Sequence, residues 1–317
     1  KRLMQLYDKV ENLAYTHDVF IVNYENVYHP LFIISLKKYI YTVIVSGDDP
    51  DNSESRSKPY VYAFDHSFAW GVNFDPYNKI IDKFITWGAK RADWWPHGVN
   101  DVMYDSSLSE NKIYQQKRDI DLVYVGSPFA KLDRLATIKF AFPKMKIYGR
   151  GWNFKALLSH PLRNKKLYGR WQWETLLGVF KSIILRLWQV KELAPDELIP
   201  TYQRSKIGLN FHLSFGPCNR RLYQLPANGV MQICDCPDGL GIVYDEGREI
   251  VPYKSDKEVI KSIRYYLNHD MDRKELAAAG FKRVMKDYKR STTFQKAMAK
   301  VKKGMIKDGI THSKEGT

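Results

Sequence analysis

The residues best placed to do chemistry follow an apolar run at 207–211. After this run come Gly and Pro at 216–217, a helical segment that opens with Arg220 and Arg221, and a second apolar run at 230–234. This order predicts strand, turn, helix and strand. Ligands of open α/β sheets bind at the carboxyl ends of strands, where helix amino ends favour phosphate. Two arginines there oppose the helix dipole unless an anion compensates them, so we expect a diphosphate contact; ordinary surface ion pairs are the alternative.

Two glycine-bearing turns follow apolar runs upstream of this unit. Gly126 and Ser127 end one run, and Gly149 and Arg150 end the next. Glycine lets the backbone approach a ligand closely, and Arg150 is suited to pair with phosphate. Two plain tight turns are an equally good interpretation. Neither turn completes G-x-G-x-x-G or the P-loop pattern, which disfavours a Rossmann dehydrogenase and a P-loop enzyme.

Acidic and histidine side chains follow expected strands in the first half of the chain. We expect them at the carboxyl ends of strands 41–46 and 60–64, facing an interdomain cleft. One of them would be the general base: Asp48, Asp49, Asp65 or His66. A simple turn is the alternative for the two adjacent aspartates. A structural histidine is the more common outcome for His66, and the same holds for His212.

Cysteine and metal patterns give little support to a metal centre. The chain has three cysteines, Cys218, Cys234 and Cys236. An odd number without framework spacing argues against structural disulfides and for a reducing compartment. The Cys-Asp-Cys triplet lacks a nearby His/Cys pair, and no zinc spacing, H-E-x-x-H or nucleophile elbow occurs. We therefore predict no metal ligands.

Apolar runs that alternate with helical patterns predict parallel, doubly wound sheets of the α/β class. Strands are expected at 18–23, 41–46, 60–64, 83–87, 121–127, 146–148, 207–211, 230–234 and 250–252. Helices are expected at 1–16, 30–38, 131–142, 256–268 and 272–288. The order of these elements repeats after residue 120, which indicates two similar domains.

The polar stretch 100–119 predicts an interdomain linker. We expect a first Rossmann-like domain at 1–118, short of its initial strand, a second at 119–290, and a C-terminal helix or frayed tail at 291–317. The chain opens with an amphipathic helical pattern rather than a signal peptide, and it has no apolar run long enough to span a bilayer.

An insertion at 164–197 contains a segment, 173–188, whose apolar residues recur at helical spacing. They are Trp173, Leu176, Leu177, Phe180, Ile184, Leu187 and Trp188. Packing on its own domain is the more common fate of such a helix; the alternative is a position in a membrane interface, where Trp and basic residues are favoured. The formal charge of +15 indicates an anionic partner: a nucleotide, an anionic membrane or a nucleic acid.

Several motifs of the second half resemble the CgeB-like glycosyltransferases, which have the GT-B fold. They are DLVYVGS, KIYGRGW, the SKIGLNFH segment after Tyr202, N-x-R-x-Y-Q at 219–224, and EGREIVPY with the helical segment after it. The resemblance covers 121–288. It departs from the family at Gln224, where a glutamate normally holds the ribose, and at 286–289, where KDYK replaces H-T-Y-x-x-R.

The resemblance implies two facing Rossmann-like domains, with the acceptor on the first and a nucleotide sugar on the second. The donor would be a UDP-, GDP- or dTDP-sugar, with no tightly bound cofactor. Arg150 and Arg221 would neutralise the departing diphosphate without metal, and Tyr223 and Gln224 would line the nucleoside pocket. The implied donor-binding set is Gly126, Ser127, Tyr148, Gly149, Arg150, Asn210, His212, Asn219, Arg221, Tyr223 and Gln224.

These observations favour a glycosyltransferase acting on a cell-envelope glycan, a glycolipid or another membrane-linked acceptor. Such an enzyme would be cytoplasmic and peripheral to the inner face of the membrane, with 173–188 contacting anionic lipid. A second hypothesis is an enzyme of the same fold that glycosylates a modified nucleic-acid base; a nucleic acid is the less favoured partner, because no basic stripe with interleaved aromatics occurs. A third is a GT-B-like binding protein that has lost catalysis, a hypothesis kept open by Gln224.

Overall fold

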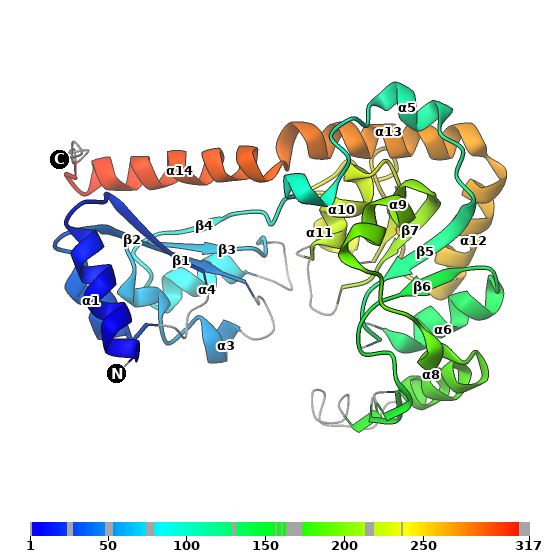
Figure 1. The fold of residues 1–317 in the computed structure, drawn as a ribbon, viewed down its shortest axis with the longest axis horizontal. Coiled ribbons are helices and arrows are strands. Elements are labelled where there is room, and N and C mark those ends of the chain that lie inside the picture. The colour runs from blue at the N-terminus through cyan, green and yellow to red at the C-terminus, as the bar shows by residue number, and fades with distance from the viewer. Residues whose placement is uncertain are drawn as a thin grey trace. The chain divides into compact units, whose positions relative to one another are not determined.

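The computed structural model describes residues 2–23, 28–47, 53–73, 79–128, 131–155, 157–159, 161–162, 173–212, 219–235 and 237–310 (Figure 1). The described chain forms two compact units. Unit 1 comprises residues up to His97 and from Arg290 onward, and unit 2 comprises the described residues from Gly98 to Lys289. Unit 2 thus begins earlier than the domain boundary expected at 118, and the C-terminal helix belongs to unit 1.

Unit 1 is a four-stranded parallel sheet with helices on both faces. Its strands are β1 (Val19–Asn23), β2 (Tyr41–Ser46), β3 (His66–Ala69) and β4 (Ala92–Trp94), side by side in this order. One face packs on α14 (Arg290–Lys307) through Ala297 and Val301. The other is covered by α2 (Pro30–Leu36), the 3-10 helix η2 (Val61–Ala63) and α4 (Ile80–Thr86). Helix α1 (Arg2–Ala14) packs on α2 and the short α3 (Ser53–Arg56) precedes η2.

Two predicted strands of the first half are wrong. The stretch expected as a strand at 60–64 forms η2, and the stretch at 83–87 falls in α4 and its end. Alternating burial at 60–64 suits a strand as well as a 3-10 turn, whereas α4 buries Ile80 and Phe84 at helical spacing. The sheet is completed instead by His66–Ala69 and Ala92–Trp94.

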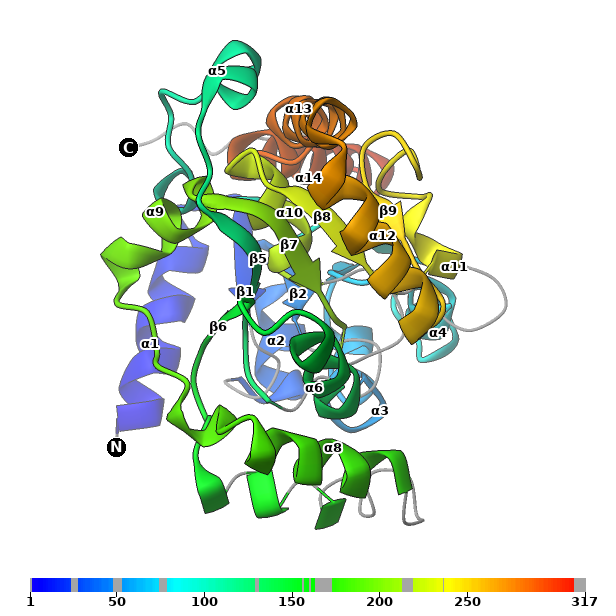
Figure 2. The same cartoon turned by 90° about the vertical axis from the view of Figure 1, so that its right-hand side faces the viewer.

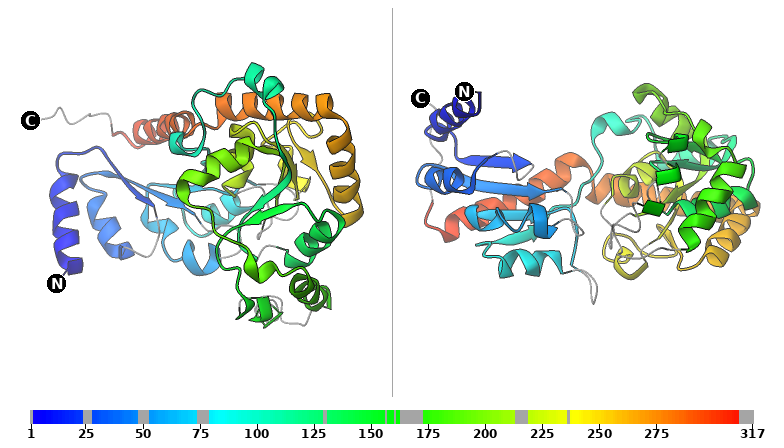
Figure 3. Two further views of the ribbon diagram at one scale, coloured as in Figure 1. Left: turned by 45° about the vertical axis from the view of Figure 1, so that its right-hand side comes forward. Right: turned by 90° about the horizontal axis from the view of Figure 1, so that it is seen from below.

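Helix α14 lies along the sheet of unit 1 (Figure 3). Part of the tail that was expected to be frayed is helical as far as Lys307, and residues 311–317 lie outside the described residues. A side chain at Gly304 would come within 2.4 Å of the Tyr41 hydroxyl, so glycine allows the close approach of α14 to β2. Just beyond the helix, Asp308 accepts hydrogen bonds of 2.7 and 2.6 Å from Arg91. It also forms an ion pair with Lys90, with 2.8 Å between the charged atoms.

Unit 2 contains a five-stranded parallel sheet, in the spatial order β6-β5-β7-β8-β9. The strands are β5 (Ile120–Val125), β6 (Lys146–Tyr148), β7 (Ser205–Asn210), β8 (Met231–Cys234) and β9 (Val251–Pro252). The longer helices are α5 (Glu110–Gln115), α6 (Leu132–Ala141), α8 (Trp173–Ile184), α9 (Leu198–Gln203), α10 (Arg221–Ala227), α12 (Asp256–Asn268) and α13 (Asp270–Asp287). Short turns complete the unit: η3 (Asp101–Met103), η4 (Leu187–Gln189), η5 (Pro195–Glu197) and α11 (Pro237–Leu240).

The strands β5 to β9 and the helices α6, α8, α10, α12 and α13 lie where the sequence predicts them, and the predicted α/β class with parallel sheets is confirmed. Helices α5 and α9 were not predicted, and α5 lies within the polar stretch 100–119 that was expected to be a linker. Helices α6 and α12 pack on one face of the sheet, and α9 and α10 pack on the other. Helix α10 comes close to β7 because Gly208 has no side chain; a Cβ there would lie 2.5 Å from Leu225. This close approach sets the position of the amino end of α10.

Helix α8 packs along α6 at the margin of unit 2 (Figure 2). Gly178 allows the contact, since a side chain there would meet the Asp133 backbone at 2.5 Å. Val179 and Ser182 are buried, but Trp173, Phe180 and Ile184 are 81%, 61% and 58% exposed. The helix therefore packs on its own unit, as one of the two interpretations expected, while an apolar stripe faces solvent.

The Asp308 cluster predicts a pH-dependent contribution to stability. Hydrogen bonds from Arg91 lower the pKa of Asp308 below its ordinary value of 3.8. Stability from a lowered carboxyl pKa is present above the unfolded value and is lost as the pH falls through the folded value. We expect Asp308→Asn to reduce the free energy of unfolding by about 1–3 kcal/mol at pH 7.

Urea unfolding followed by tryptophan fluorescence measures this difference, which should shrink as the pH falls below 3.8. Asp8→Asn, a change of the same charge at an exposed position of α1, should have no effect at either pH. A deficit of Asp308→Asn that persists at acid pH contradicts the electrostatic explanation.

Candidate functional site

The guanidinium of Arg221 joins the carboxyl ends of two neighbouring strands of unit 2. Its Nη1 donates to the carbonyl of Val125, at the end of β5, at 2.9 Å. Its Nη2 donates to the carbonyl of Phe211, just past β7, at 2.7 Å. The Tyr124 ring lies below it, with 4.7 Å between the guanidinium carbon and the ring centroid. Arg221 therefore carries a partly buried positive charge at this edge of the sheet.

The two glycine turns meet at the same point. A side chain on Gly126 would come within 2.1 Å of Arg221 Nη1, and a side chain on Gly149 would come within 2.1 Å of the Gly126 carbonyl. Gly149 has φ +145°, which also favours glycine. The Gly126 N–H donates to Tyr148 O at 2.8 Å, and Trp152 Nε1 donates to the Gly126 carbonyl at 2.8 Å. The two glycines are therefore required by the close packing of these turns on each other and on Arg221.

The remaining side chains of these turns differ in exposure. Ser127 is exposed, and its carbonyl accepts a hydrogen bond from the Tyr124 hydroxyl at 3.1 Å. Arg150 is 86% exposed and pairs with Glu192. Tyr148 is partly buried and packs beside Val125. Ser127 and Arg150 are thus accessible to a ligand, whereas Tyr148 mainly supports the turn.

Asparagine side chains fix the start of α10. Asn219 Nδ2 donates to Asn210 Oδ1 at 2.7 Å and to Phe211 O at 3.1 Å, and Asn219 Oδ1 accepts from the Leu222 N–H at 3.1 Å. Asn219 therefore caps the helix and ties it to β7. The Nδ2 atom of Asn210 is buried and has no hydrogen-bond partner.

A chain of charged groups lies beside this edge, where β7 and β8 end. His212 donates its backbone N–H to Asp235 at 2.9 Å, and its Nδ1 lies 2.7 Å from the same carboxylate. Lys131 Nζ lies 2.5 Å from the other oxygen of Asp235. Burial raises the pKa of Asp235, but hydrogen bonding and electrostatic attraction from His212, and then from Lys131, outweigh it and lower this pKa to about 2.

An ionised carboxylate only accepts hydrogen bonds, so Asp235 fixes the proton of His212 on Nδ1. In the neutral ring Nε2 is then an acceptor; it is buried and has no partner. Lys131 and Asp235 were missed by the sequence analysis. The available signal was an acidic residue directly after a predicted strand, but the Cys-Asp-Cys context drew attention to thiols. Nothing local indicated that Lys131 reaches Asp235.

His212, Cys234 and Asp235 are close enough together to be considered as metal ligands: one potential ligand atom of each lies within 4.8 Å of the others. The ammonium of Lys131, however, already neutralises Asp235. Asp235 is thus already paired with a cation, which leaves its carboxylate less available to a divalent metal.

The side chains expected to line a nucleoside pocket lie deeper than anticipated. Tyr223 is fully buried, and its ring lies 5.1 Å from that of Tyr288. Gln224 is 9% exposed. Helix α10 has seven residues, so its dipole is small and Arg221 supplies most of the positive charge at the site.

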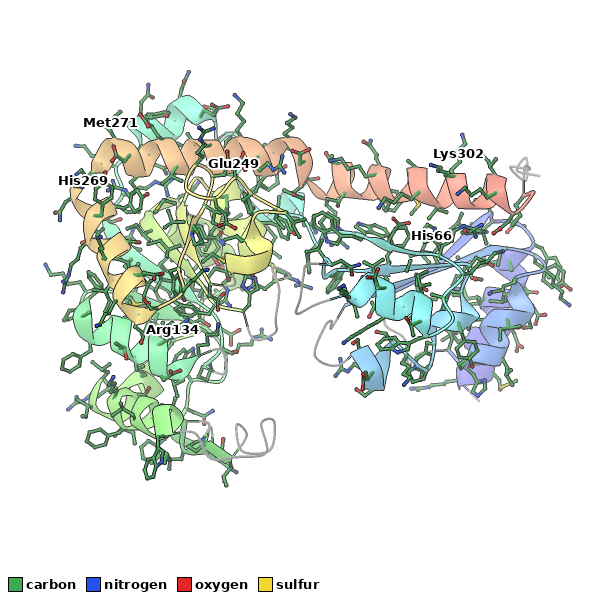
Figure 4. The ribbon with its side chains drawn as sticks, turned by 180° about the vertical axis from the view of Figure 1, so that it is seen from behind. His66, Arg134, Glu249, His269, Met271 and Lys302 are labelled. Carbon is green, nitrogen blue, oxygen red and sulfur yellow. The ribbon has the colours of Figure 1, made fainter. Side chains whose placement is uncertain are left out.

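The expected placement of Asp65 and His66 at the carboxyl end of a strand is wrong, since both lie at the amino end of β3. Asp65 is buried and accepts hydrogen bonds of 3.0 and 2.9 Å from the N–H and hydroxyl of Thr42. His66, labelled in Figure 4, is buried, and its ring stacks on that of Phe68. Its Nε2 forms a hydrogen bond of 2.9 Å with the carboxylate of Asp93. Both are structural groups in this arrangement, and Asp48 and Asp49 lie outside the described residues.

Solved structures with similar folds are glycosyltransferases and related proteins. Anabaena HepE, crystallised with UDP-glucose, shares 14% identity over 94% of this chain and 82% of its own, with a TM-score of 0.62. Sucrose-phosphate synthase from Thermosynechococcus elongatus shares 11% over 95% and 77%, with a TM-score of 0.61. A glycosyltransferase from Rickettsia africae shares 11% over 96% and 81%, with a TM-score of 0.62. These likenesses confirm the predicted GT-B fold.

No curated protein sequence matches this chain. A family model described as glycosyl transferase-like matches residues 132–299, which is more than half of the 317 residues and includes most of the edge built around Arg221. The chain belongs to this glycosyl transferase-like family.

Proposed function

We propose that the protein transfers a sugar from a nucleoside-diphosphate sugar to an acceptor hydroxyl, with the donor bound at the carboxyl edge of the unit 2 sheet. The observation that carries the proposal is the convergence of Gly126, Gly149 and Arg221. The two glycines leave the backbone open to a ligand beside the fixed positive charge of Arg221. The exposed residues Ser127 and Arg150 lie in the same two turns.

A departing nucleoside diphosphate needs positive charge that is in place before the bond breaks. Arg221 is held in place by two backbone carbonyls and retains further N–H groups, because a guanidinium has five. Arg150 adds a second, mobile charge. With these two arginines supplying the charge, we expect transfer without a divalent metal.

The arginines and glycines of this edge support a nucleoside-diphosphate sugar as the class of donor. The choice of nucleotide is supported by a solved structure of similar fold. HepE was crystallised with UDP-glucose, so a UDP-sugar is our first choice of donor. The motifs at 121–127 and 219–224 favour the CgeB-like subtype within the family. The presence of Gln224 in place of the usual glutamate predicts a weaker hold on the ribose.

His212 is proposed to contact the sugar rather than the diphosphate. Its Nε2 is an acceptor in the neutral ring, and an acceptor pairs with a hydroxyl, not with a phosphate oxygen. Asp235 and Lys131 act through His212 by fixing its proton and its orientation. The three residues would therefore position the sugar for transfer.

Arg150→Ala tests the diphosphate assignment. The exposed side chain can be removed without disturbing the core, so we expect UDP to bind about five- to tenfold more weakly by calorimetry. Arg248→Ala is the matched control, because Arg248 is 84% exposed and also pairs with one carboxylate. Equal affinity of the two variants for UDP contradicts the assignment, and the absence of UDP, GDP or dTDP binding to the wild type would sink the proposed function.

His212→Gln tests the sugar contact. We expect its affinity for UDP-glucose to fall about tenfold while its affinity for UDP stays within about twofold, because UDP lacks the sugar. Asp235→Asn should change the two affinities in the same way. If both ligands weaken equally, His212 acts on the fold or on the diphosphate instead. Circular dichroism of each variant verifies that it is folded.

We further propose that α8 places the enzyme on an anionic membrane surface, near a lipid-linked or cell-envelope acceptor. Its solvent-facing stripe includes Trp173, Phe180 and Ile184, and exposed Arg186 and Lys191 flank it. Apolar side chains beside cations suit a lipid interface. No helix in the described part of the chain could span a bilayer.

Flotation with vesicles tests the α8 proposal. The wild type should float with vesicles that contain anionic lipid and not with neutral ones, and a Trp173→Ala, Phe180→Ala variant should lose about nine-tenths of this binding, since two large apolar side chains are removed. Met271→Ala, Ile306→Ala removes two other exposed apolar side chains and should float like the wild type. If both variants lose vesicle binding equally, or if the wild type does not float, the proposal that α8 binds a membrane is refuted.

A further inference from the structure

A second candidate site lies at the opposite, amino edge of the unit 2 sheet. A recess of about 700 Å³ opens there beside the residues that precede β5 and β8 and the start of β7, and α13 forms its wall. The described residues His269 and Met271, labelled in Figure 4, mark the start of that helix. The volume suits a small ligand. Its key lining residues are Ile113, Arg118, Lys206, Gly229, Arg273 and Lys274.

The lining of this recess carries excess positive charge. It contains five cations, Lys117, Arg118, Lys206, Arg273 and Lys274, and two carboxylates, Asp119 and Asp270. Asp270 is shared, because both Arg273 and Lys274 bond to it. Arg204 pairs with Asp119 and Lys206 pairs with Asp121. Arg204 and Asp121 lie outside the lining and have opposite charges, so counting them leaves the excess at three positive charges.

Arg118 contributes a charge that none of its hydrogen-bond partners neutralises. Its Nη1 donates to the carbonyls of Tyr202 and Ser205 at 3.1 and 2.7 Å. Its Nη2 donates to Gln116 Oε1 at 3.0 Å and to the Asn228 carbonyl at 3.2 Å. All four acceptors are uncharged.

Burial, together with repulsion from Arg273, lowers the pKa of Arg118 to about 10. A nearby anion would relieve this repulsion. Gly229 brings the backbone against the same guanidinium, because a side chain there would lie 2.8 Å from Arg118 Nη2. The charge of Arg118 is therefore fixed in the wall of the recess.

We propose that this recess binds a small soluble anion with two phosphate groups, at a site separate from the donor edge. Two phosphate groups carry about three to four negative charges at neutral pH, which matches the excess of three. The ammonium groups of Lys206 and Lys274 come from different elements and can hydrogen-bond the ligand. Arg118 has used its four Nη hydrogens and acts through its charge.

Inorganic pyrophosphate is the probe, and the full chain is first saturated with UDP so that the donor edge is occupied. Calorimetry should still detect pyrophosphate binding. A Lys206→Ala, Lys274→Ala variant should bind it about tenfold more weakly, since two charge-assisted hydrogen bonds are lost. The control Lys302→Ala, Lys303→Ala removes two exposed lysines of α14 and should bind within about twofold of the wild type.

Hydrogen exchange locates the ligand independently of the proposed function. Pyrophosphate should protect amides around 112–119 and 267–277, whereas binding at the donor edge would protect 125–128 and 219–224. The proposal is overturned if UDP abolishes all pyrophosphate binding, if the two double variants weaken it equally, if protection appears only at the donor edge, or if the wild type binds no pyrophosphate. If Lys206→Ala, Lys274→Ala also loses vesicle binding, a lipid headgroup and not a soluble anion is the ligand.

Discussion

The contact between Arg221 and two backbone carbonyls is the constraint on which the candidate donor edge depends. Carbonyl groups at strand ends have left the hydrogen-bonded ladder, and an unsatisfied buried one costs about 1–3 kcal/mol. Arg221 satisfies Val125 and Phe211 at once and so fixes the spacing of β5 and β7. The same contact excludes a side chain at Gly126. One interaction thus explains the glycine, the shape of the turn and the positive charge at this edge.

Arg118 makes the corresponding contact at the other end of the sheet. It donates to the carbonyl of Ser205, at the start of β7, and to that of Asn228, before β8. Neither Arg118 nor Arg221 has a carboxylate among its described hydrogen-bond partners. A lysine could not replace either one, because a single ammonium lacks the planar fork that reaches two strands. Since carbonyls do not cancel the charge, structural arginines of this kind leave both edges attractive to anions.

The sequence predicts helices and strands well where the spacing of apolar residues matches only one type of element, and poorly where it fits both. The strand at 146–148 and the helix at 256–268 have the predicted bounds. The failures at 60–64 and 83–87 are short apolar segments: burial at 60–64 fits a strand as well as a 3-10 turn, and 83–87 is too short to reveal the helical spacing of Ile80 and Phe84. In the site, Gly126 and Arg221 could be predicted because each lies at a strand-to-helix turn. Lys131 could not, because its partner Asp235 is distant in sequence and the contact depends on tertiary packing.

The Lys131–Asp235–His212 chain explains why we propose a sugar contact rather than a metal at this edge. Lys131 adopts a left-handed backbone conformation, with φ 55°, which is unfavourable for lysine. The strain is tolerated where it brings a cation to a buried carboxylate whose pKa is about 2. With that carboxylate ionised and engaged by Lys131 and His212, its lone pairs are largely committed. The buried Nε2 of His212 has no described partner, and it is the acceptor that we propose pairs with a sugar hydroxyl.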